Sequence, residues 1–450
     1  MSARGPTSAG DIDGWSRRSP RVRVVGVSVS LAAIVLAAGR SRRMQSDLPK
    51  VLHRALGPTL VEHVVRAAAE VGATRQVVVA SPEHQDAIAR ELAPWAASAG
   101  VELDVVVQAE PKGTAHAVQA AEAALRGFEG RALVLMGDVP CISADSLQAL
   151  LDGHQGGVTL LSGQVEDPYA YGRVVRDPDG ALAAIVEEKD ADEATRAIRE
   201  INVGNYVFAL PQAFTWLSQV TPSPQTGELY LTQVIELARA AGAPTVAVDA
   251  ARPEDMLGVN TRVQLAEATA ALRERTNRGH MLNGVTIVDP ATAWIDVRAS
   301  IGRDARIEPC VVIQGACRIE AGAVVGPFAH VRGESVIGAE ARVGNFVEVV
   351  RSEVGPRARA LHLTYVGDAT LGAEANLGAG TVFANYDGER HHASRVGEGA
   401  SLGANTVVVG PSTVEAGART GAGAVVAKAV VPAGETWVGV PASAISRGVR

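Results

Sequence analysis

Two groups of residues in the first third of the chain have the types and spacing for phosphate chemistry. The small-residue segment 36–39 follows an apolar run, and the cations Arg43 and Lys50 come soon after it. Backbone N–H groups in such a loop can approach phosphates closely, and the cations add positive charge. A lone carboxylate, Asp138, ends a second apolar run, where it is costly unless water or a cation solvates it. These residues predict a site for a phosphate-bearing ligand and a cation.

A residue much further along the chain, His362, is of a type that can take part in acid–base chemistry. It stands in the string Leu-His-Leu-Thr-Tyr-Val-Gly-Asp over residues 361–368, ahead of the pair Asn385 and Tyr386. A lone histidine in a repetitive segment is more often structural. In the same way, a plain strand-to-helix loop with solvated arginines is the alternative for residues 36–43.

The first half must position the phosphate-binding residues, and its pattern predicts a doubly wound sheet. Apolar, β-rich runs alternate with amphipathic helical runs. We expect strands at 31–36, 76–80, 101–108 and 132–136, and helices at 60–71, 83–92 and 114–125. This alternation favours parallel strands, which bind ligands beyond their carboxyl ends. Residues 36–39 and Asp138 fall at such ends.

The last third repeats isoleucine or valine every six residues, which is typical of a solenoid. The beat is unbroken from residue 301 to residue 349, and it slips by one residue before Val354 and again before Leu371. We expect each hexad to form one flat side of a prism, with the apolar residue inside. A glycine often follows that residue and is expected to allow the corner. Three hexads per turn imply about seven coils. Sandwich strands are the alternative, but they alternate with period two.

Composition limits the partners and the compartment. The 450 residues carry a formal charge of −7, and no block of Lys or Arg stands out beyond the first fifty residues, so we expect no nucleic-acid partner. No apolar stretch is long enough to indicate a membrane span. Cys141, Cys310 and Cys317 show no metal spacing, and we expect free thiols in the cytoplasm.

Residues 1–30 are expected to be a disordered tail or an upstream misassigned start. Arginines precede the apolar run 24–38, which superficially resembles a signal peptide. Ser28 and Ser30 interrupt that run, however, and it ends in the phosphate-binding segment, so we do not expect export.

The segment Leu36-Ala37-Ala38-Gly39-Arg40-Ser41-Arg42-Arg43, followed by Leu48-Pro49-Lys50, resembles the signature of the sugar-1-phosphate nucleotidyltransferases. These enzymes join an NTP to a sugar phosphate and release pyrophosphate. The resemblance implies catalytic roles for Arg43 and Lys50, and Mg²⁺ ligands at Asp138 and Asn260. The nucleotide-binding residues that it implies are Leu36, Ala37, Ala38, Gly39, Lys50, Gln108, Gly113 and Thr114. Those implied for the sugar phosphate are Gly172, Glu187, Asn202 and Asn260.

The six-residue repeat resembles the β-helix of the hexapeptide-repeat acyltransferases, which use acyl-CoA and usually form trimers with active sites between subunits. With both halves together, residues 31–430 resemble the bifunctional bacterial UDP-N-acetylglucosamine pyrophosphorylase / glucosamine-1-phosphate N-acetyltransferase family. The resemblance implies a cytoplasmic homotrimer. It implies an α/β Rossmann-like nucleotidyltransferase domain at 31–257, a linker helix at 258–283, and a left-handed parallel β-helix of hexapeptide repeats at 284–450.

Two reactions follow from this resemblance. The β-helix half would acetylate glucosamine 1-phosphate with acetyl-CoA, and the other half would couple N-acetylglucosamine 1-phosphate to UTP. The matching motifs make His362 the general base, with Glu348 to orient or polarise it. The residues implied for the acetyl acceptor are Arg332, Glu348, Tyr365 and Asn376. Those implied for acetyl-CoA are Asn385, Tyr386, Ala404 and Ala422, and the Asn-Tyr pair is also expected to help hold sugar and phosphate.

The chain departs from this family at several positions. Pro111 replaces a usual glutamine, Val350 aligns with a lysine, and a second lysine aligns near His391. A serine expected at CoA aligns with Ala404, and the basic C-terminal tail is replaced by the sequence 437–442. The changes in the second half concern phosphate recognition and CoA affinity in the second site.

Two alternatives stay open at the level of sequence. One is a uridyltransferase whose β-helix is a trimerisation scaffold or acts on a different acceptor. The other is a sugar-nucleotide-binding protein without turnover, against which the presence of Lys50, Asp138 and His362 argues. No residue reads as a code for uracil, so the base and sugar come from the resemblance alone.

Overall fold

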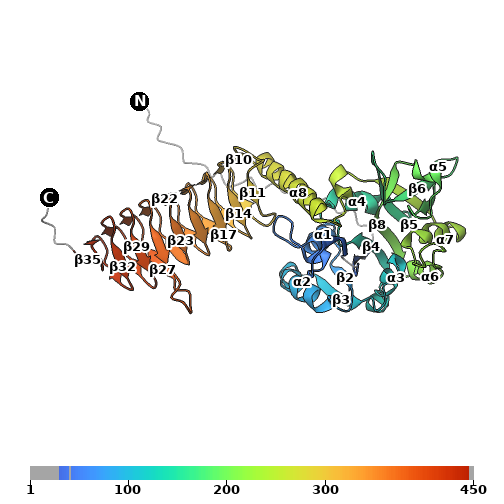
Figure 1. Cartoon of the computed structure of the whole chain (residues 1–450), viewed down its shortest axis with the longest axis horizontal. Coiled ribbons are helices and arrows are strands. Elements are labelled where there is room, and N and C mark those ends of the chain that lie inside the picture. The colour runs from blue at the N-terminus through green and yellow to red at the C-terminus, as the bar shows by residue number, and fades with distance from the viewer. Residues whose placement is uncertain (1–29, 40–41, 445–450) are drawn as a thin grey trace, which may run out of the picture.

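The computed structural model describes residues 30–39 and 42–444. The molecule is elongated, with an α/β part at one end, a long helix in the middle and a prism of short strands at the other end (Figure 1). The expectation for the N-terminal segment concerns residues 1–29, which lie outside the described residues.

The α/β part is built on a nine-stranded sheet whose central order is β3-β2-β1-β4-β8-β5-β9. Its strands are β1 Leu31–Ala37, β2 Arg75–Ala80, β3 Glu102–Val107, β4 Gly130–Met136, β5 Val158–Gln164, β6 Gly172–Arg176, β7 Leu182–Val186, β8 Glu200–Leu210 and β9 Thr245–Asp249. Strands β1 to β4 are parallel, as predicted. The prediction of parallel strands is wrong for β8, which runs antiparallel to both β4 and β5.

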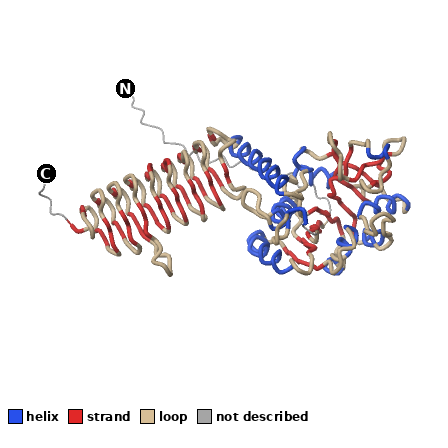
Figure 2. Tube along the Cα trace, in the orientation of Figure 1, coloured by secondary structure: helices blue, strands red, loops and turns tan. Residues whose placement is uncertain are grey.

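Helices cover both faces of this sheet (Figure 2). The α-helices are α1 Leu60–Glu70, α2 Gln85–Ala99, α3 Thr114–Gln119, α4 Ala144–Asp152, α5 Glu193–Arg196, α6 Gln212–Leu217, α7 Val234–Ala240 and α8 Arg262–Leu282. Short 3-10 helices are η1 Arg42–Met44, η2 Lys50–Leu52, η3 Ala123–Leu125, η4 Leu231–Gln233 and η5 Pro253–Met256. The single helix predicted at 114–125 is broken into α3 and η3. Successive side chains of β1 enter two separate cores, Ile34 on one face and Val35 on the other.

Three sheets of parallel strands form the faces of the prism, and every third strand from β10 to β34 belongs to the same face. The last strand, β35, pairs antiparallel with β34. The first face holds β10 Thr286–Ile287, β13 Arg306–Ile307, β16 Val324–Val325, β19 Arg342–Asn345, β22 Arg359–His362, β25 Asn376–Leu377, β28 Ser401–Leu402, β31 Arg419–Thr420, β34 Thr436–Val438 and β35 Ser443–Ala444. The second holds β11 Trp294–Ile295, β14 Val312–Gln314, β17 His330–Arg332, β20 Glu348–Val350, β23 Tyr365–Gly367, β26 Val382–Ala384, β29 Val407–Val409 and β32 Val425–Ala427. The third holds β12 Ser300–Ile301, β15 Arg318–Ile319, β18 Val336–Ile337, β21 Glu353–Val354, β24 Ala369–Leu371, β27 Ser394–Val396, β30 Thr413–Val414 and β33 Val430–Val431.

This part is the left-handed β-helix that the repeat predicts. Residues of the six-residue beat, such as Ile307, Val331 and Val343, are fully buried and form one continuous core. The second and third faces each hold eight strands, so the prediction of about seven coils is one too few. The missing coil contains Ile287 and Ile295, which lie upstream of the point where the regular beat begins.

The slips in the beat are changes in coil length. Arg306 pairs with Val324 and Val324 with Arg342, each eighteen residues on. Arg342 then pairs with Arg359 and Arg359 with Asn376, each seventeen residues on. One residue is therefore lost at a corner while the strands stay in register.

The glycines after the beat residues serve a different purpose from the one predicted. Most of them do not adopt a left-handed backbone, and the corners instead place non-glycine residues there, such as Phe346 with a φ of 54° and Leu363 with a φ of 48°. A Cβ on Gly344 would lie 2.0 Å from the carbonyl oxygen of Leu361 in the next coil. Glycine is required because adjacent coils approach backbone to backbone.

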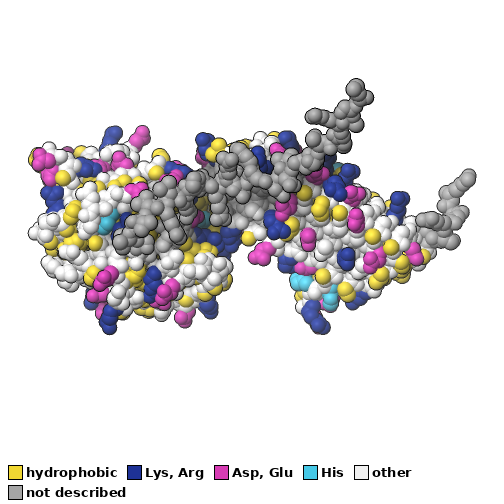
Figure 3. Space-filling model, turned by 180° about the vertical axis from the view of Figure 1, so that it is seen from behind, with side chains coloured by type: hydrophobic (Ala, Val, Ile, Leu, Met, Phe, Trp, Pro, Cys, Tyr) yellow, Lys and Arg dark blue, Asp and Glu magenta, His cyan; other side chains and the backbone are white. Residues whose placement is uncertain are grey.

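Both charge signs are interspersed over the two parts on the face seen in Figure 3. Cys141, Cys310 and Cys317 are free thiols, as predicted. Within the described part of the chain, no helix combines the length and apolar character that crossing a bilayer requires.

We predict that Gly344→Ala lowers stability by about 1–3 kcal/mol, because the added methyl group must push two coils apart. The matched control is Gly279→Ala in α8, where a Cβ meets nothing within 4 Å. That change should be neutral or should stabilise by about 0.5–1 kcal/mol, since alanine favours helix over glycine. Thermal denaturation of both variants checks the prediction, and equal Tm values would contradict the packing argument.

Candidate active sites

A cavity of about 200 Å³ lies at the carboxyl ends of β1 and β4. All eight residues implied for nucleotide binding line it, together with Asp138. They are Leu36, Ala37, Ala38, Gly39, Lys50, Gln108, Gly113 and Thr114. The sequence therefore brings these segments to one place because neighbouring parallel strands end at the same edge of the sheet.

Polar side chains converge on the Lys50 ammonium group beside this cavity. Lys50 Nζ is paired with the Asp138 carboxylate and lies 2.8 Å from Asn260 Oδ1. Arg43 Nη2 donates to the same Asn260 oxygen at 2.9 Å. The oxygens of Asp138 and Asn260 thus lie close to the same positively charged group. Two ligands of one metal ion would also have to lie close to a single cation. Burial, and then the negative charge of Asp138, raises the pKa of the Tyr171 hydroxyl.

Two local structures explain how residues so distant in sequence meet. Val259 N donates to Asp138 O at 2.8 Å, which ties the segment before α8 to the end of β4. Thr261 and Gln264 then form a capping box that starts α8, and Gln264 Oε1 also accepts from Asn260 N at 2.9 Å. The Asn260 side chain is fixed because its backbone is held from both sides.

The opposite wall of the cavity is joined to a later loop. Gly113 has a φ of 120°, and a Cβ there would lie 2.4 Å from Leu229 O, so glycine is required. Thr114 Oγ1 accepts from Leu231 N at 2.9 Å. Gln108 Nε2 donates to Gly113 O at 3.0 Å, which leaves its carbonyl oxygen as an acceptor for a ligand.

The predicted sugar-site residues lie together one strand further along. A Cβ on Gly172 would lie 3.5 Å from Glu187 Oε2 and 3.7 Å from Asn202 Cβ. Thr232 donates to Glu187 at 3.2 Å, and Asn202 donates to Tyr206 at 2.7 Å. Glu187 and Thr232 border a second cavity of about 370 Å³, whereas Gly172 and Asn202 do not.

The sequence reasoning missed Thr232 and also Glu228, which lines the nucleotide cavity. Both lie on the loop that Thr114 anchors. Their place depends on tertiary hydrogen bonds, and no local motif signals it. Pro111, noted as a departure, lines the same cavity.

His362 lies at a corner of the prism, between the first and second faces. Its side chain is exposed, and its Nδ1 lies 3.0 Å from Asn345 Oδ1 on the preceding coil. An amide oxygen only accepts, so Nδ1 carries the hydrogen and Nε2 is the basic nitrogen. The register pair Asn345 and His362 explains this contact.

The role of Glu348 towards His362 stays a prediction. Within this chain Glu348 lies on the second face and accepts from Arg332 Nε at 2.7 Å. His330 Nδ1 lies 3.9 Å from the same carboxylate, and burial lowers the pKa of that imidazole. The contact to the His362 ring within the chain comes from Asn345, which lies on the same corner.

The remaining predicted acetyl-transfer residues fall into separate groups. Ala404 and Ala422 are exposed on the His362 corner, and Gly423 N donates to Ala404 O at 2.8 Å. Tyr365 lies beside Glu348 on the second face. Asn376 pairs with Arg359, three residues before His362 and thus about 10 Å from it along the strand.

Asn385 and Tyr386 lie at the far corner of the second face, where residues 385–393 project from the prism beside β27 (Figure 1). The Asp368 carboxylate accepts hydrogen bonds from two side chains at this corner. Arg351 Nε and Nη2 donate at 2.7 and 2.8 Å, and Asn385 Nδ2 donates at 2.5 Å. His391 Nδ1 lies 3.1 Å from the same carboxylate. The Arg351 guanidinium holds the pKa of Asp368 below its usual range. The guanidinium group of Arg351 is therefore a positively charged group at this corner, although Val350 and His391 stand where the family has lysines.

Known proteins are similar in sequence to both halves of this chain. Residues 33–201 match a family model described as a MobA-like NTP transferase domain. Bifunctional protein GlmU of Corynebacterium glutamicum is 41% identical over 440 residues, which is 90% of each chain. The chain belongs to the GlmU family. GlmU of Streptococcus equi subsp. zooepidemicus is 37% identical, with 92% of this chain and 96% of the relative covered.

A GlmU from Mycolicibacterium gilvum is 39% identical, with 89% of this chain and 88% of the relative covered. Membership of the GlmU family over nearly the whole chain agrees with a nucleotidyltransferase domain joined to a β-helix. The chain is an enzyme with two functional halves, and the resemblance stated on the sequence motifs is confirmed at the level of the family.

We predict that Glu187→Gln raises Tm at neutral pH. Burial raises the pKa of Glu187 above its ordinary value of 4.5, so the folded state disfavours the charged form. The cost to the free energy of unfolding is absent below pH 4.5, where the carboxyl group is protonated in both states. It grows as the pH rises from 4.5 to the raised pKa of the folded state and is complete above it. The Tm difference between Glu187→Gln and wild type should therefore shrink towards zero as the pH falls through that range. A wild type more stable than the variant at pH 8 would contradict the prediction.

Proposed function

We propose that this member of the GlmU family catalyses two reactions at two sites. Residues 284–450 transfer the acetyl group of acetyl-CoA to glucosamine 1-phosphate. Residues 31–257 then transfer the uridylyl group of UTP to N-acetylglucosamine 1-phosphate and release pyrophosphate, and residues 258–283 link the two. The observation that carries this proposal is the convergence of Lys50, Asp138 and Asn260 beside the predicted nucleotide cavity.

In the uridylyl step a phosphate oxygen of the sugar phosphate attacks the α-phosphorus of UTP. The bond to the β-phosphate breaks, and pyrophosphate leaves. Lys50 and Arg43 balance negative charge on the triphosphate, and the backbone of residues 36–39 lines the space for it. The Gln108 carbonyl oxygen is a suitable acceptor for an N–H of the base. Glu187 and Asn202 hold the sugar hydroxyls, so the step rests on positioning.

The donor set beside the cavity fits Mg²⁺. The Asp138 carboxylate and the Asn260 amide oxygen already share one cation, the Lys50 ammonium group. The described residues contain no cluster of three or more His, Cys, Asp or Glu, so substrate phosphates and water would supply the other ligands. When bound, Mg²⁺ would neutralise phosphate charge.

In the acetyl step the amine of glucosamine 1-phosphate attacks the thioester carbonyl. His362 Nε2 takes a proton from that amine, and Asn345 keeps the hydrogen on Nδ1. The C–S bond breaks, and the CoA thiolate leaves and is protonated. Ala404 and Ala422, on the same corner, offer a surface for acetyl-CoA without bulky side chains.

A homotrimer would complete the second site. Within one chain, Asn376, Asn385 and Tyr386 lie away from the His362 corner. Phe328 and Phe346 stack at 5.3 Å near this corner and are 51% and 56% exposed, and Leu363 is 63% exposed. Apolar side chains so exposed favour packing against another copy. Such packing would bring the far corner of one chain to the His362 corner of the next.

We place both reactions in the cytoplasm, where UTP and acetyl-CoA are available. The free thiols of the three cysteines fit that compartment. The partners are the four small-molecule substrates.

Asp138→Ala should lower the rate of pyrophosphate release by at least about 100-fold, since it removes a charged group at the reacting phosphates. Acetyl transfer should be unchanged, because His362 lies on the other half of the molecule. The control is Asp86→Ala, an exposed carboxylate on α2. Coupled assays of pyrophosphate and free thiol measure both rates. Loss of both activities in Asp138→Ala would contradict two independent sites.

His362→Ala should lower thiol release from acetyl-CoA with glucosamine 1-phosphate by about 100-fold or more, while pyrophosphate release persists. His84→Ala, on the other half of the chain, is the control. If wild type releases no thiol but still makes pyrophosphate, the β-helix is a scaffold or acts on another acceptor.

A further inference from the structure

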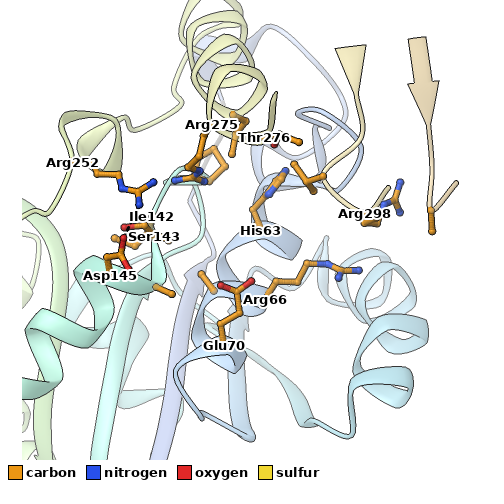
Figure 4. A pocket seen from close by; sticks show the side chains of 16 residues that line it. His63, Arg66, Glu70, Ile142, Ser143, Asp145, Arg252, Arg275, Thr276 and Arg298 are labelled. Carbon is orange, nitrogen blue, oxygen red and sulfur yellow. Dashed lines mark hydrogen bonds and ion pairs between the residues drawn. The ribbon is translucent and has the colours of Figure 1, made fainter. Parts of the chain in front are cut away.

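A cavity of about 640 Å³ lies where the α/β part, α8 and the first coils of the β-helix meet. Figure 4 shows Arg252 and Asp145 at one end, Arg66 and Arg298 at the other, and Arg275 between them. It shares no lining residue with the nucleotide cavity. The volume is in the range of small-molecule sites.

The walls of this cavity are held together by direct contacts between the two halves. Val297 N donates to Leu56 O at 3.2 Å. Gly57 approaches Asp296 so closely that a Cβ would lie 2.1 Å from its carboxylate. On α8, Asn277 Nδ2 donates to Pro290 O and Ala293 O at 2.9 and 3.0 Å. The cavity is thus framed by packed segments.

Four arginines from four segments line the cavity, and acids fix the positions of two of them, Arg66 and Arg298. Glu62 accepts from Arg66 Nε and Nη2 at 2.9 and 2.7 Å. Asp296 accepts from Arg298 Nε and Nη2 at 2.9 and 2.7 Å. The Nη1 groups of these two arginines have no hydrogen-bond partner among the described residues. A guanidinium held in this way offers its remaining N–H groups without further ordering.

The other two arginines each have one hydrogen-bond partner. Arg275 Nη1 donates to Cys141 O at 2.7 Å, and Arg252 Nη2 donates to Asp145 at 2.6 Å. Planar guanidinium groups are well matched to phosphate oxygens. The arginines therefore favour a ligand that carries a phosphate group.

Two carboxylates in the lining restrict that ligand further. Glu70 makes no hydrogen bond or ion pair within the described residues and is exposed towards the cavity. Partial desolvation raises its pKa, against the charges of Arg275 and Arg66. Asp145 keeps one oxygen beyond its contact with Arg252. These acceptors would repel a bare anion but would accept hydrogen bonds from hydroxyl groups.

We propose that this cavity is a binding site for a phosphorylated polyol such as a sugar phosphate. The arginines bind its phosphate, and Glu70 and Asp145 bind its hydroxyls. The ligand would touch both halves of the molecule. It would also lie against the segment that follows Asp138 and against α8, which begins beside Asn260.

The test is titration calorimetry on the full-length protein with glucose 6-phosphate and, in parallel, with inorganic phosphate. We expect saturable binding of glucose 6-phosphate below about 10 mM and a rise in Tm with its concentration. Arg66→Gln and Arg252→Gln should each weaken binding roughly tenfold, because each removes a charged donor. The matched control is Arg90→Gln, an exposed arginine on α2.

The variant Glu187→Gln tests which cavity holds the ligand, because Glu187 belongs to the sugar-phosphate pocket of the first active site and does not line this cavity. Binding of glucose 6-phosphate should be unchanged in this variant. Loss of binding in Glu187→Gln, with normal binding in both arginine variants, would overturn the proposal. So would the absence of binding to wild type up to about 10 mM, or equal affinity for inorganic phosphate. The unliganded Tm and the rate of pyrophosphate release show that each arginine variant is folded.

Discussion

The backbone hydrogen bond from Val259 N to Asp138 O is the contact on which the arrangement of the first site depends. It brings a segment that is remote in sequence to the end of β4, so that Asn260 and Asp138 face the same ammonium group. The capping box then starts α8 at once, and α8 leads to the first coil of the prism. One junction therefore sets both the candidate metal ligands and the start of the arm.

The β-helix follows a different constraint, which is the space between coils. Its interior is filled by small and medium apolar side chains, and its backbones approach so closely that some positions admit only glycine. The polar side chains that are buried here are small and hydrogen-bonded, as Thr406 is to Thr420 at 2.8 Å, and larger polar groups lie mostly on the faces and corners. A catalytic histidine on such a frame must lie outside, and its orienting partner must come from the coil before or after it. His362 and Asn345 have this relation.

The sequence predicted those features of the fold and the site that follow from the regular geometry of parallel sheets and of the six-residue repeat. Residues 36–39 and Asp138 could be placed together because strand ends meet at one edge of a parallel sheet. The six-residue beat predicted the buried positions of the prism because each side has a fixed length. Neither rule gives the direction of a strand, so the antiparallel β8 was missed. Corner contacts depend on which coils are neighbours, so the contact between Asn345 and His362 was missed.

Coil length has a further consequence for the relation between the two sites. Coils of seventeen residues are one residue shorter at a corner, and their strands still pair in register. Changes in chain length are therefore compatible with the prism at a corner or as whole coils. β22, which carries His362, is the fifth strand of its face. At about 4.8 Å per strand it stands about 19 Å beyond β10. The distance from the arm to the proposed acetyl-transfer site can therefore change only in steps of one coil. Adding or removing one coil below it would change the path of an intermediate between the sites by about 5 Å and leave each site intact.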